Sequence, residues 1–299
     1  MNISKNLKYF FILPAALSVL ALLAIVLWGL KPGIDLSGGA LLQVSYQGTV
    51  PTAAQIQNVT APLNLGEVRV QPTGENAYVL RTRPLTTDEK SVLETALATL
   101  GTAHEDQYTS VGPVIGTELL DKGLLALGLV TVCIILFIAF AFRAVSKPVQ
   151  SWKYGIVAII TLAHDVLIPT GLFALLGRIN GAEVDSLFIV GLLTILGISI
   201  NDTIVVFDRI RENLALNETH HKREEFDQVV GRSIMQTLAR SINTSLTVVI
   251  VLAALYFVGP ATTKDFALTL IVGMIAGTYS SIFLASPLLV AWEKWQKRS

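Results

Sequence analysis

The sequence has 299 residues, of which 52% are hydrophobic and 15% are charged, and its formal net charge is zero. A soluble domain carries about 25% charged residues, so this composition excludes a disordered chain, an ordinary soluble enzyme and a nucleic-acid binder built on net positive charge. The single cysteine, Cys133, excludes an intrachain disulfide. These numbers predict a polytopic α-helical membrane protein with one soluble segment.

Six stretches are apolar for long enough to cross a bilayer, because about 20 residues of helix span its hydrocarbon core. They cover residues 9–30, 119–142, 154–176, 184–208, 239–258 and 265–291. The first is too long for a signal peptide, and no small-x-small cleavage site follows Trp28, so we expect a retained anchor. The expected parts are a first transmembrane helix over 1–30, an external domain over 31–118, and a five-helix bundle over 119–299.

The placement of positive charge predicts the orientation, since cytoplasmic loops are rich in Lys and Arg. Only Arg178 and Lys264 lie in the two short loops on one side of the spans. The other side holds fourteen: Lys5, Lys8, Arg143, Lys147, Lys153, Arg209, Arg211, Lys222, Arg223, Arg232, Arg240, Lys294, Lys297 and Arg298. Both termini are therefore expected in the cytoplasm, and the segment 31–118 outside it.

The external segment has its own alternation of short elements. Strands are expected over 41–46, 67–71, 77–83 and 104–110, with helices over 51–63 and 86–100 and a turn over 72–74. Thr86 and Glu89 have the spacing of a capping box. The order β-α-β-β-α-β predicts a small ferredoxin-like α+β domain between the first two membrane helices. Its one histidine, His104, is expected to be solvated, and no metal site is expected.

A glycine-rich segment, Gly33 to Gly39, precedes the first strand and contains Asp35 and Gly38. It lacks the Lys-Ser/Thr pair that completes a phosphate-binding loop. We therefore interpret it as a tight turn at the point where the first span enters the external domain.

Span 4 contains an acidic residue, Asp202, six residues before Asp208 and so about 9 Å inside the cytoplasmic border. An ionisable group in a spanning helix marks an ion pathway or a buried pair. A carboxyl at that depth is protonated, paired or solvated through a wet cavity, and each state depends on the supply of protons. We interpret Asp202 as a proton-carrying group flanked by Asn201 and Thr203; a permanent ion pair between two helices is the alternative.

Span 5 offers a partner for this acid. Arg240 opens the span, and Asn243 and Thr244 follow it in a half-helix that is too polar to face lipid. The Arg240 side chain is long enough to reach the level of Asp202, although snorkelling to lipid headgroups is the alternative. The polar groups after it can carry water or bind neighbouring helices together.

Span 3 contains His164 and Asp165, four residues before Pro169, which removes one helical hydrogen bond there. No nucleophile motif and no zinc-protease motif accompanies the pair, so we expect no enzyme. We interpret Asp165 as a polar element of the helix bundle, and a place in the proton route stays open for it. The charged stretch 209–238 is expected as a cytoplasmic connector along the membrane face, with one apolar stripe of Phe226, Val229, Val230 and Ile234.

These motifs, taken together, resemble the SecF family, the smaller half of the bacterial SecDF protein-export factor. The resemblance rests on residues 201–213, which contain Asp202, Asp208 and Arg209, and on residues 33–39, 164–166 and 240–245. It implies a fold of the resistance-nodulation-division superfamily, in the cell inner membrane, with protons as the coupling ion and no other cofactor.

The same resemblance implies a translocase role in the Sec pathway. The implied partners are SecD, the SecYEG channel, the SecA ATPase, the translocating preprotein and membrane lipid, with no nucleic acid. Asp202 is then the proton-carrying carboxylate, Arg240 its charge partner, and Asp165 a supporting polar residue. A proton-coupled small-molecule exporter and a purely structural, channel-stabilising subunit remain as alternatives.

Overall fold

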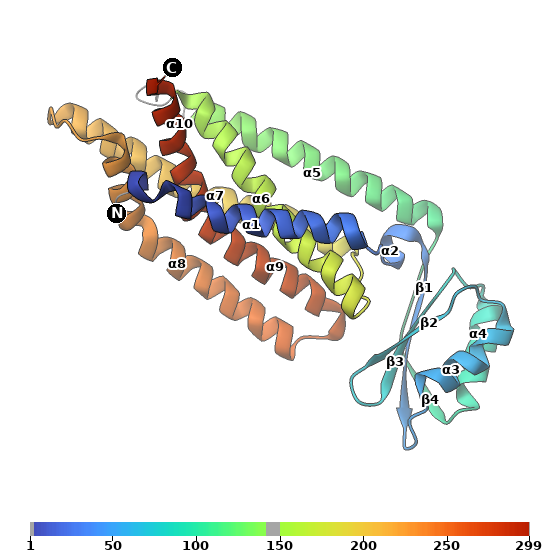
Figure 1. Ribbon diagram of the computed structural model, residues 1–299. Coiled ribbons are helices and arrows are strands. Elements are labelled where there is room, and N and C mark those ends of the chain that lie inside the picture. The colour runs from blue at the N-terminus through green and yellow to red at the C-terminus, as the bar shows by residue number, and fades with distance from the viewer. Residues whose placement is uncertain (1–2, 142–149, 299) are drawn as a thin grey trace. The chain divides into compact units, whose positions relative to one another are not determined.

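A computed structural model describes residues 3–141 and 150–298. These residues form two compact units (Figure 1). The membrane unit comprises the described residues within 1–31, 125–182 and 187–299, and the external unit comprises 32–124 together with the short segment 183–186. Arg143 and Lys147, two residues of the predicted charge pattern, lie outside the described residues.

The prediction of six spans is confirmed. Within the described residues, six helical segments are long and apolar enough to cross a membrane: 9–28, 113–141, 152–179, 186–219, 226–258 and 263–297. The helices that carry them are α1 (Ile3–Trp28), α5 (Pro113–Ala141), α6 (Ser151–Ile179), α7 (Ser186–Thr219), α8 (Phe226–Val258), α9 (Ala261–Ser280) and α10 (Ser286–Arg298).

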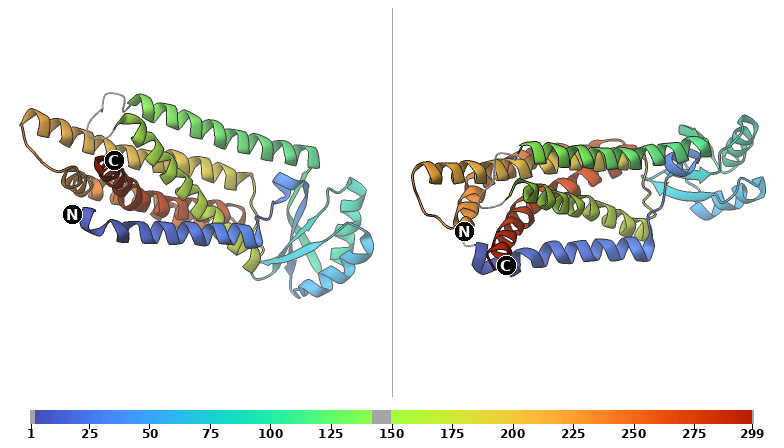
Figure 2. Two further views of the ribbon diagram at one scale, coloured as in Figure 1. Left: turned by 45° about the horizontal axis from the view of Figure 1, so that its top comes forward. Right: turned by 90° about the horizontal axis from the view of Figure 1, so that it is seen from above.

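Small residues let several of these helices approach closely. A Cβ built on Gly171 of α6 would lie 2.4 Å from the Cα of Ala21 in α1, so these two backbones touch. Helix α6 also packs on α9, and α9 on α8; Figure 2 shows these helices from two further sides. Small residues at interfaces are the usual means of close helix packing in a bilayer, where dispersion rather than hydrophobic burial drives association.

The sixth span is interrupted by a π-helical turn, Ser281–Ala285, between α9 and α10. Pro287 follows it and cannot donate a backbone hydrogen bond. The Ser286 hydroxyl donates to the Ser281 carbonyl at 3.1 Å, one residue further back than an α-helical bond. Hydropathy gives no signal for this turn, and the sequence-based prediction missed it.

The predicted connector over 209–238 is formed mainly by extensions of two membrane helices. Helix α7 continues to Thr219 and α8 already begins at Phe226. Phe226 and Ile234, two residues of the predicted apolar stripe, are buried in the core of the membrane unit. The amide of Asn213 donates to Ser233 and to Gln236, both at 2.8 Å, which ties the two helix extensions to each other.

The external unit is a four-stranded antiparallel sheet with the order β2-β3-β1-β4, as a ferredoxin-like domain requires. Two helices cover one face of the sheet (Figure 1). The core between them contains Leu42, Tyr46, Leu80 and Leu93. The elements are β1 (Gly39–Gln47), α3 (Ala53–Thr60), the 3₁₀ turn η1 (Ala61–Leu63), β2 (Arg69–Thr73), β3 (Ala77–Thr82), α4 (Thr87–Ala98) and β4 (Thr102–Val111).

The local predictions for this domain are largely confirmed. Thr86 and Glu89 form the expected capping box at the start of α4, and His104 is exposed on β4. The hairpin turn falls at residues 74–76 rather than 72–74, because Pro72 and Thr73 still pair with β3.

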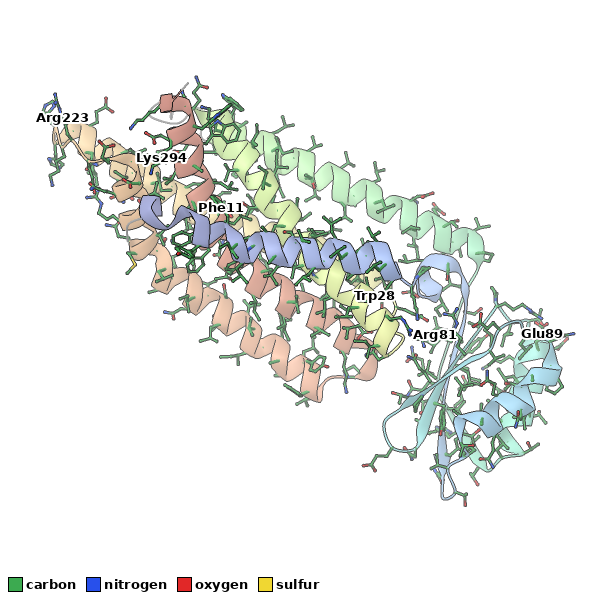
Figure 3. All side chains as sticks on the ribbon, in the orientation of Figure 1. Phe11, Trp28, Arg81, Glu89, Arg223 and Lys294 are labelled. Atoms are coloured by element: carbon green, nitrogen blue, oxygen red, sulfur yellow. The ribbon has the colours of Figure 1, made fainter. Side chains whose placement is uncertain are left out.

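One ion pair stabilises the start of α4, and Figure 3 labels Glu89, its acidic member. The guanidinium of Arg83 donates to the Glu89 carboxylate, which also accepts from the Thr86 amide. These bonds favour the charged carboxylate and lower the pKa of Glu89 to about 2.

The glycine segment forms more than the predicted turn, because it contains a short helix, α2 (Ile34–Ser37). Gly38 follows with φ +78°, and Gly39 has φ +145°. A Cβ at Gly38 would lie 2.6 Å from the Cα of Pro113, and a Cβ at Gly116 would lie 2.6 Å from the Gly38 amide nitrogen. The glycines therefore let this segment touch the first turn of α5.

Candidate proton-coupling site

Asp202 is buried, with 6% of its surface exposed, and faces hydroxyl groups from two neighbouring helices. Its Oδ2 lies 3.5 Å from the Ser245 hydroxyl of α8 and 3.5 Å from the Thr278 hydroxyl of α9. Ser245 and Thr278 also contact each other through their hydroxyl oxygens. We call these two side chains the hydroxyl pair.

Each member of the hydroxyl pair has a second acceptor on its own helix. Ser245 lies 2.9 Å from the Ser241 carbonyl, and Thr278 lies 2.9 Å from the Met274 carbonyl. A hydroxyl has one proton and two lone pairs. When the hydroxyl donates to its helix carbonyl, its oxygen can accept a hydrogen bond from the protonated carboxyl of Asp202; when it rotates, it can donate a hydrogen bond to the carboxylate. The hydroxyl pair therefore suits both protonation states.

Asp165 is a second buried carboxyl, with 0% exposure, and both of its oxygens have partners. His164 Nδ1 lies 3.0 Å from one oxygen, and the Ser199 hydroxyl of α7 donates to the other. Asp165 therefore joins α6 to α7. Its partner in α7, Ser199, lies three residues before Asp202. The aromatic ring of Tyr279 in α9 packs near His164, with ring centroids 6.0 Å apart.

A ladder of close contacts holds α7 against α9 at this level. Thr269, Gly273 and Gly277 recur every four residues along α9, and Ser281 continues this spacing into the π turn; all four face α7. A Cβ at Gly273 would lie 2.1 Å from the Ile195 side chain, and a Cβ at Gly277 would lie 2.9 Å from the Ser199 Cβ. Ser281, the first residue of the π turn, meets Thr203 at 3.0 Å. The π turn thus lies beside the residue that follows Asp202.

The structure places Arg240 at the surface of α8 rather than in contact with Asp202. Within the part of the chain that the structure describes, no ion pair joins them, and Arg240 acts on Asp202 only through space. Asn201, Asn243 and Thr244 are also exposed. Of the predicted supporting residues, only Thr203 and His164 are buried. The role of Arg240 as a charge partner stays a prediction.

The exposed polar residues of α8 share one face. Arg240, Asn243, Thr244 and Thr247 follow one another at the spacing i, i+3, i+4, i+7. We call these four residues the α8 stripe. The Thr247 hydroxyl donates to the Asn243 carbonyl at 2.6 Å. Arg240 and Asn243 carry larger polar groups, which are costly to place in hydrocarbon, so this face is unsuited to lipid.

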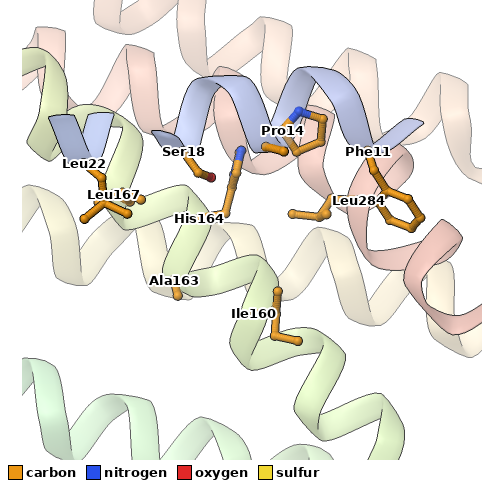
Figure 4. A pocket seen from close by; sticks show the side chains of 10 residues that line it. Phe11, Pro14, Ser18, Leu22, Ile160, Ala163, His164, Leu167 and Leu284 are labelled. Carbon is orange, nitrogen blue, oxygen red and sulfur yellow. The ribbon is translucent and has the colours of Figure 1, made fainter. Parts of the chain in front are cut away.

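A cavity of about 430 Å³ lies between α1 and α6, and His164 points into it (Figure 4). Its other lining residues are almost all apolar, among them Phe11, Leu22 and Ile160. The Nε2 atom of His164 is buried and has no hydrogen-bond partner among the described residues. The polar side chains that line the cavity are those of His164 and Ser18.

The other predicted motif residues lie elsewhere. Gly33, Asp35, Gly38 and Gly39 belong to the external unit. Asp208 is exposed in α7, where its carboxylate pairs with Arg211 at 2.6 Å, and Arg209 pairs in the same way with Glu212 at 2.9 Å. The described residues contain no group of three or more His, Cys, Asp or Glu side chains arranged to hold a metal ion.

Sequence reasoning missed three hydroxyl residues of the site, Ser199, Thr278 and Ser281. Each is a small polar residue in a mostly apolar span, and such residues are common in membrane helices. For Ser281 the available signal was its spacing from two glycines, since Gly273, Gly277 and Ser281 repeat every four residues. That repeat predicts a small-residue helix face but does not reveal which helix packs on it.

Family comparisons agree with this architecture. The family model for "Protein export membrane protein SecD/SecF, C-terminal" matches residues 92–295, and that for the "SecD/SecF GG Motif" matches residues 29–50. The chain is 41% identical to protein translocase subunit SecF of Thermobaculum terrenum over 297 residues, which cover 95% of this chain and 91% of that protein. It is 37% identical to the same subunit of Anaerolinea thermophila over 303 residues, covering 100% and 96%.

A solved structure is similar over nearly the whole chain. The crystal structure of SecDF, a translocon-associated membrane protein from Thermus thermophilus, matches with a TM-score of 0.82 and 32% identity. The match covers 98% of this chain and 39% of that one. The present chain thus spans about two fifths of the SecDF polypeptide.

Proposed function

Because the chain belongs to the SecD/SecF family of protein export membrane proteins, we propose that it uses proton-motive force to promote late preprotein translocation across the bacterial cytoplasmic membrane. It acts as a multi-pass subunit with both termini in the cytoplasm. The names of its relatives favour this role over that of a small-molecule exporter.

The observation that carries the proposal is the buried carboxyl of Asp202 beside the hydroxyl pair. A proton that falls through 100 mV releases about 2.3 kcal/mol. That energy biases a two-state element by roughly 50-fold. In the proposed cycle, protonation of Asp202 changes how the hydroxyl pair bonds to it, and α7 shifts relative to α8 and α9. The external domain follows this shift and alternately grips and releases the emerging chain.

A partner subunit is expected on the α8 stripe. Asn201 of α7 and the four residues of the stripe are exposed in this chain alone, and a second membrane protein would give them hydrogen-bond partners that lipid cannot. The similarity to SecDF, in which a longer chain contains the matching part, supports SecD as that protein. The SecYEG channel, the SecA ATPase and the preprotein are the further partners that the family role requires.

The decisive variant is Asp202→Asn, measured as proton-motive-force-dependent export in membrane vesicles. Asparagine has nearly the same shape but cannot exchange a proton, so we expect the gradient-dependent part of export to be lost. Asp202→Glu should retain part of it. The matched control is Asp208→Asn, an exposed carboxylate on the same helix, which should export normally.

The outcome also separates the proposal from a purely structural role. If Asp202→Asn exports as well as the parent, Asp202 carries no proton and the proposal fails. If double replacement of Asp202 and Arg240 by apolar residues preserves gradient-dependent export, the subunit only stabilises the channel.

A further inference from the structure

We infer that Asp35 and Arg81 are positioning residues that fasten the start of α7, the helix of Asp202, to the sheet of the external domain. This inference rests on the proposed function and names the route by which α7 moves that domain. In this role the glycine segment transmits movement. The segment 183–186 then connects the membrane helices to the external domain, in addition to α1 and α5, which adjoin that domain in the chain.

The first observation is that 183–186 belongs to the external unit, although the rest of the loop and helix on either side belongs to the membrane unit. Before it, α6 ends at Ile179, and the Ala182 amide still donates to Leu176 of α6 at 3.4 Å. After it, α7 starts at Ser186. A few residues of chain therefore join the external unit to the first turn of α7.

Main-chain contacts attach this segment to the glycine segment. The Gly33 amide donates to the Val184 carbonyl at 2.8 Å, and Pro32 forms a parallel bridge with Val184. Val184 itself is buried. A Cβ at Gly33 would lie 3.4 Å from both the Glu183 carboxylate and the Val184 carbonyl, so the two segments lie in close contact.

Side chains add two attachments, one at each end of the segment. The Ser186 hydroxyl donates to the Asp35 carboxylate at 2.7 Å. Arg81 Nε lies 2.9 Å from Glu183 Oε2, and both side chains are largely covered, with 22% and 11% exposed. Figure 3 labels Arg81, which extends from β3. Arg81 also donates to Gln71 of β2, so the attachment reaches two strands of the sheet.

The attachments are placed to transmit a displacement along α7. Asp202 lies sixteen residues after Ser186 in one continuous helix, or about 24 Å at 1.5 Å per residue. Rigid secondary elements carry coupling between distant sites when their two ends are both held. A shift of α7 at Asp202 moves Ser186 and Glu183, and these pull on α2 and β3 through Asp35 and Arg81.

The test follows the two ends of α7 separately in proteoliposomes that contain the full chain and its partner subunit. Cys133 is first replaced by Ser. A fluorophore is then placed either at Ser91→Cys on exposed α4, or at Glu218→Cys near the exposed far end of α7. The measured quantity is the fluorescence change when a proton gradient is imposed.

We expect both labels to respond in the parent. Arg81→Glu places a carboxylate beside that of Glu183, and the two repel each other. The fluorescence change of the Ser91 label should therefore fall by roughly fivefold or more, the lower end of typical coupling factors. The Glu218 label should respond as before. The charge swap Arg81→Glu with Glu183→Arg should restore the Ser91 response, and Ser186→Ala should weaken it. If the two residues had a purely structural role, Arg81→Glu would lower the fluorescence responses of both labels together.

The matched control is Arg69→Ala, which removes a neighbouring arginine without placing a carboxylate opposite Arg81. Arg69 faces Arg81 across the β2–β3 pair, but its ion pair is with exposed Glu67, so both labels should respond normally. A full Ser91 response in Arg81→Glu overturns the inference and leaves the proposed function standing. A parent in which neither label responds overturns the proposed function together with this inference.

Discussion

Replacement of Gly277 by Ala tests the packing that holds Asp202 in place. The added methyl carbon would lie 2.9 Å from Ser199 Cβ, 3.2 Å from Ser199 Oγ and 3.4 Å from Ser199 Cα. Carbon atoms in ordinary contact are about 3.5–4.0 Å apart, so α7 and α9 must separate by several tenths of an ångström. Ser199 moves with α7, and its hydroxyl is the donor to Asp165.

The energies can be weighed against one another. Gly to Ala in an unstrained helix gains about 1 kcal/mol of helix propensity. Overpacking of a tight interface costs about 1–3 kcal/mol, and loss of a typical hydrogen bond costs about 0.5–1.5 kcal/mol. Because the bond to Asp165 is lengthened rather than fully lost, we expect a net destabilisation of about 1–3 kcal/mol.

The assay is thermal unfolding of the purified protein in detergent, with Gly128→Ala as the control. A Cβ at Gly128 in α5 would meet no described atom within 4 Å, so this variant should unfold at the parent temperature or slightly above it. Gly277→Ala should unfold about 3–8 °C lower and should also lose part of its gradient-dependent export. Equal unfolding temperatures for the two variants would refute the close packing of α7 on α9.

Three further outcomes are expected. Gly116→Ala should lower the unfolding temperature, because its Cβ would lie 2.6 Å from a backbone nitrogen that cannot move aside; retention of full stability would contradict this contact. The pKa of Glu89 is lowered to about 2, so its pairing with Arg83 stabilises the external domain fully above about pH 4.5, and this stabilisation is lost as the pH falls toward 2. Arg83→Gln removes the pairing and raises that pKa. Pepsin should therefore cleave the external domain of this variant at a higher pH than that of the parent. Ser199→Ala should destabilise by about 1–3 kcal/mol, because one oxygen of Asp165 is left buried without a donor, and an unchanged unfolding temperature would argue against this bond.

The sequence predicted the fold well where a local pattern determines the structure. Continuous apolar runs identify the six spans, because the bilayer imposes a minimum length on each helix. The capping box at Thr86 and the strand-helix alternation around it identify the external domain. The ends of α7 and α8 were missed because hydropathy changes at the membrane border, whereas helical hydrogen bonding continues to Thr219 in one helix and starts at Phe226 in the other.

The candidate site was predicted only in part, because its contacts come from different helices. Asp202 stands out as an acid in an apolar span, and the structure buries its side chain. Its neighbours depend on helix rotation, which the sequence does not reveal. Arg240 carries the strongest charge signal nearby, yet the face of α8 toward Asp202 presents Ser245, and Arg240 lies on the exposed face with Asn243 and Thr244.

The difference between an arginine neighbour and a hydroxyl neighbour bears on how Asp202 can work. A guanidinium in direct contact stabilises only the carboxylate, and removing that charge then leaves a buried cation unpaired at a cost of several kcal/mol. Ser245 and Thr278 can donate or accept, so they stabilise the acid and its anion more evenly. A proton carrier must exchange its proton in every cycle, and therefore neither state can be held too strongly. Hydroxyls in contact, with the Arg240 charge acting from a distance, meet that requirement better than a permanent ion pair.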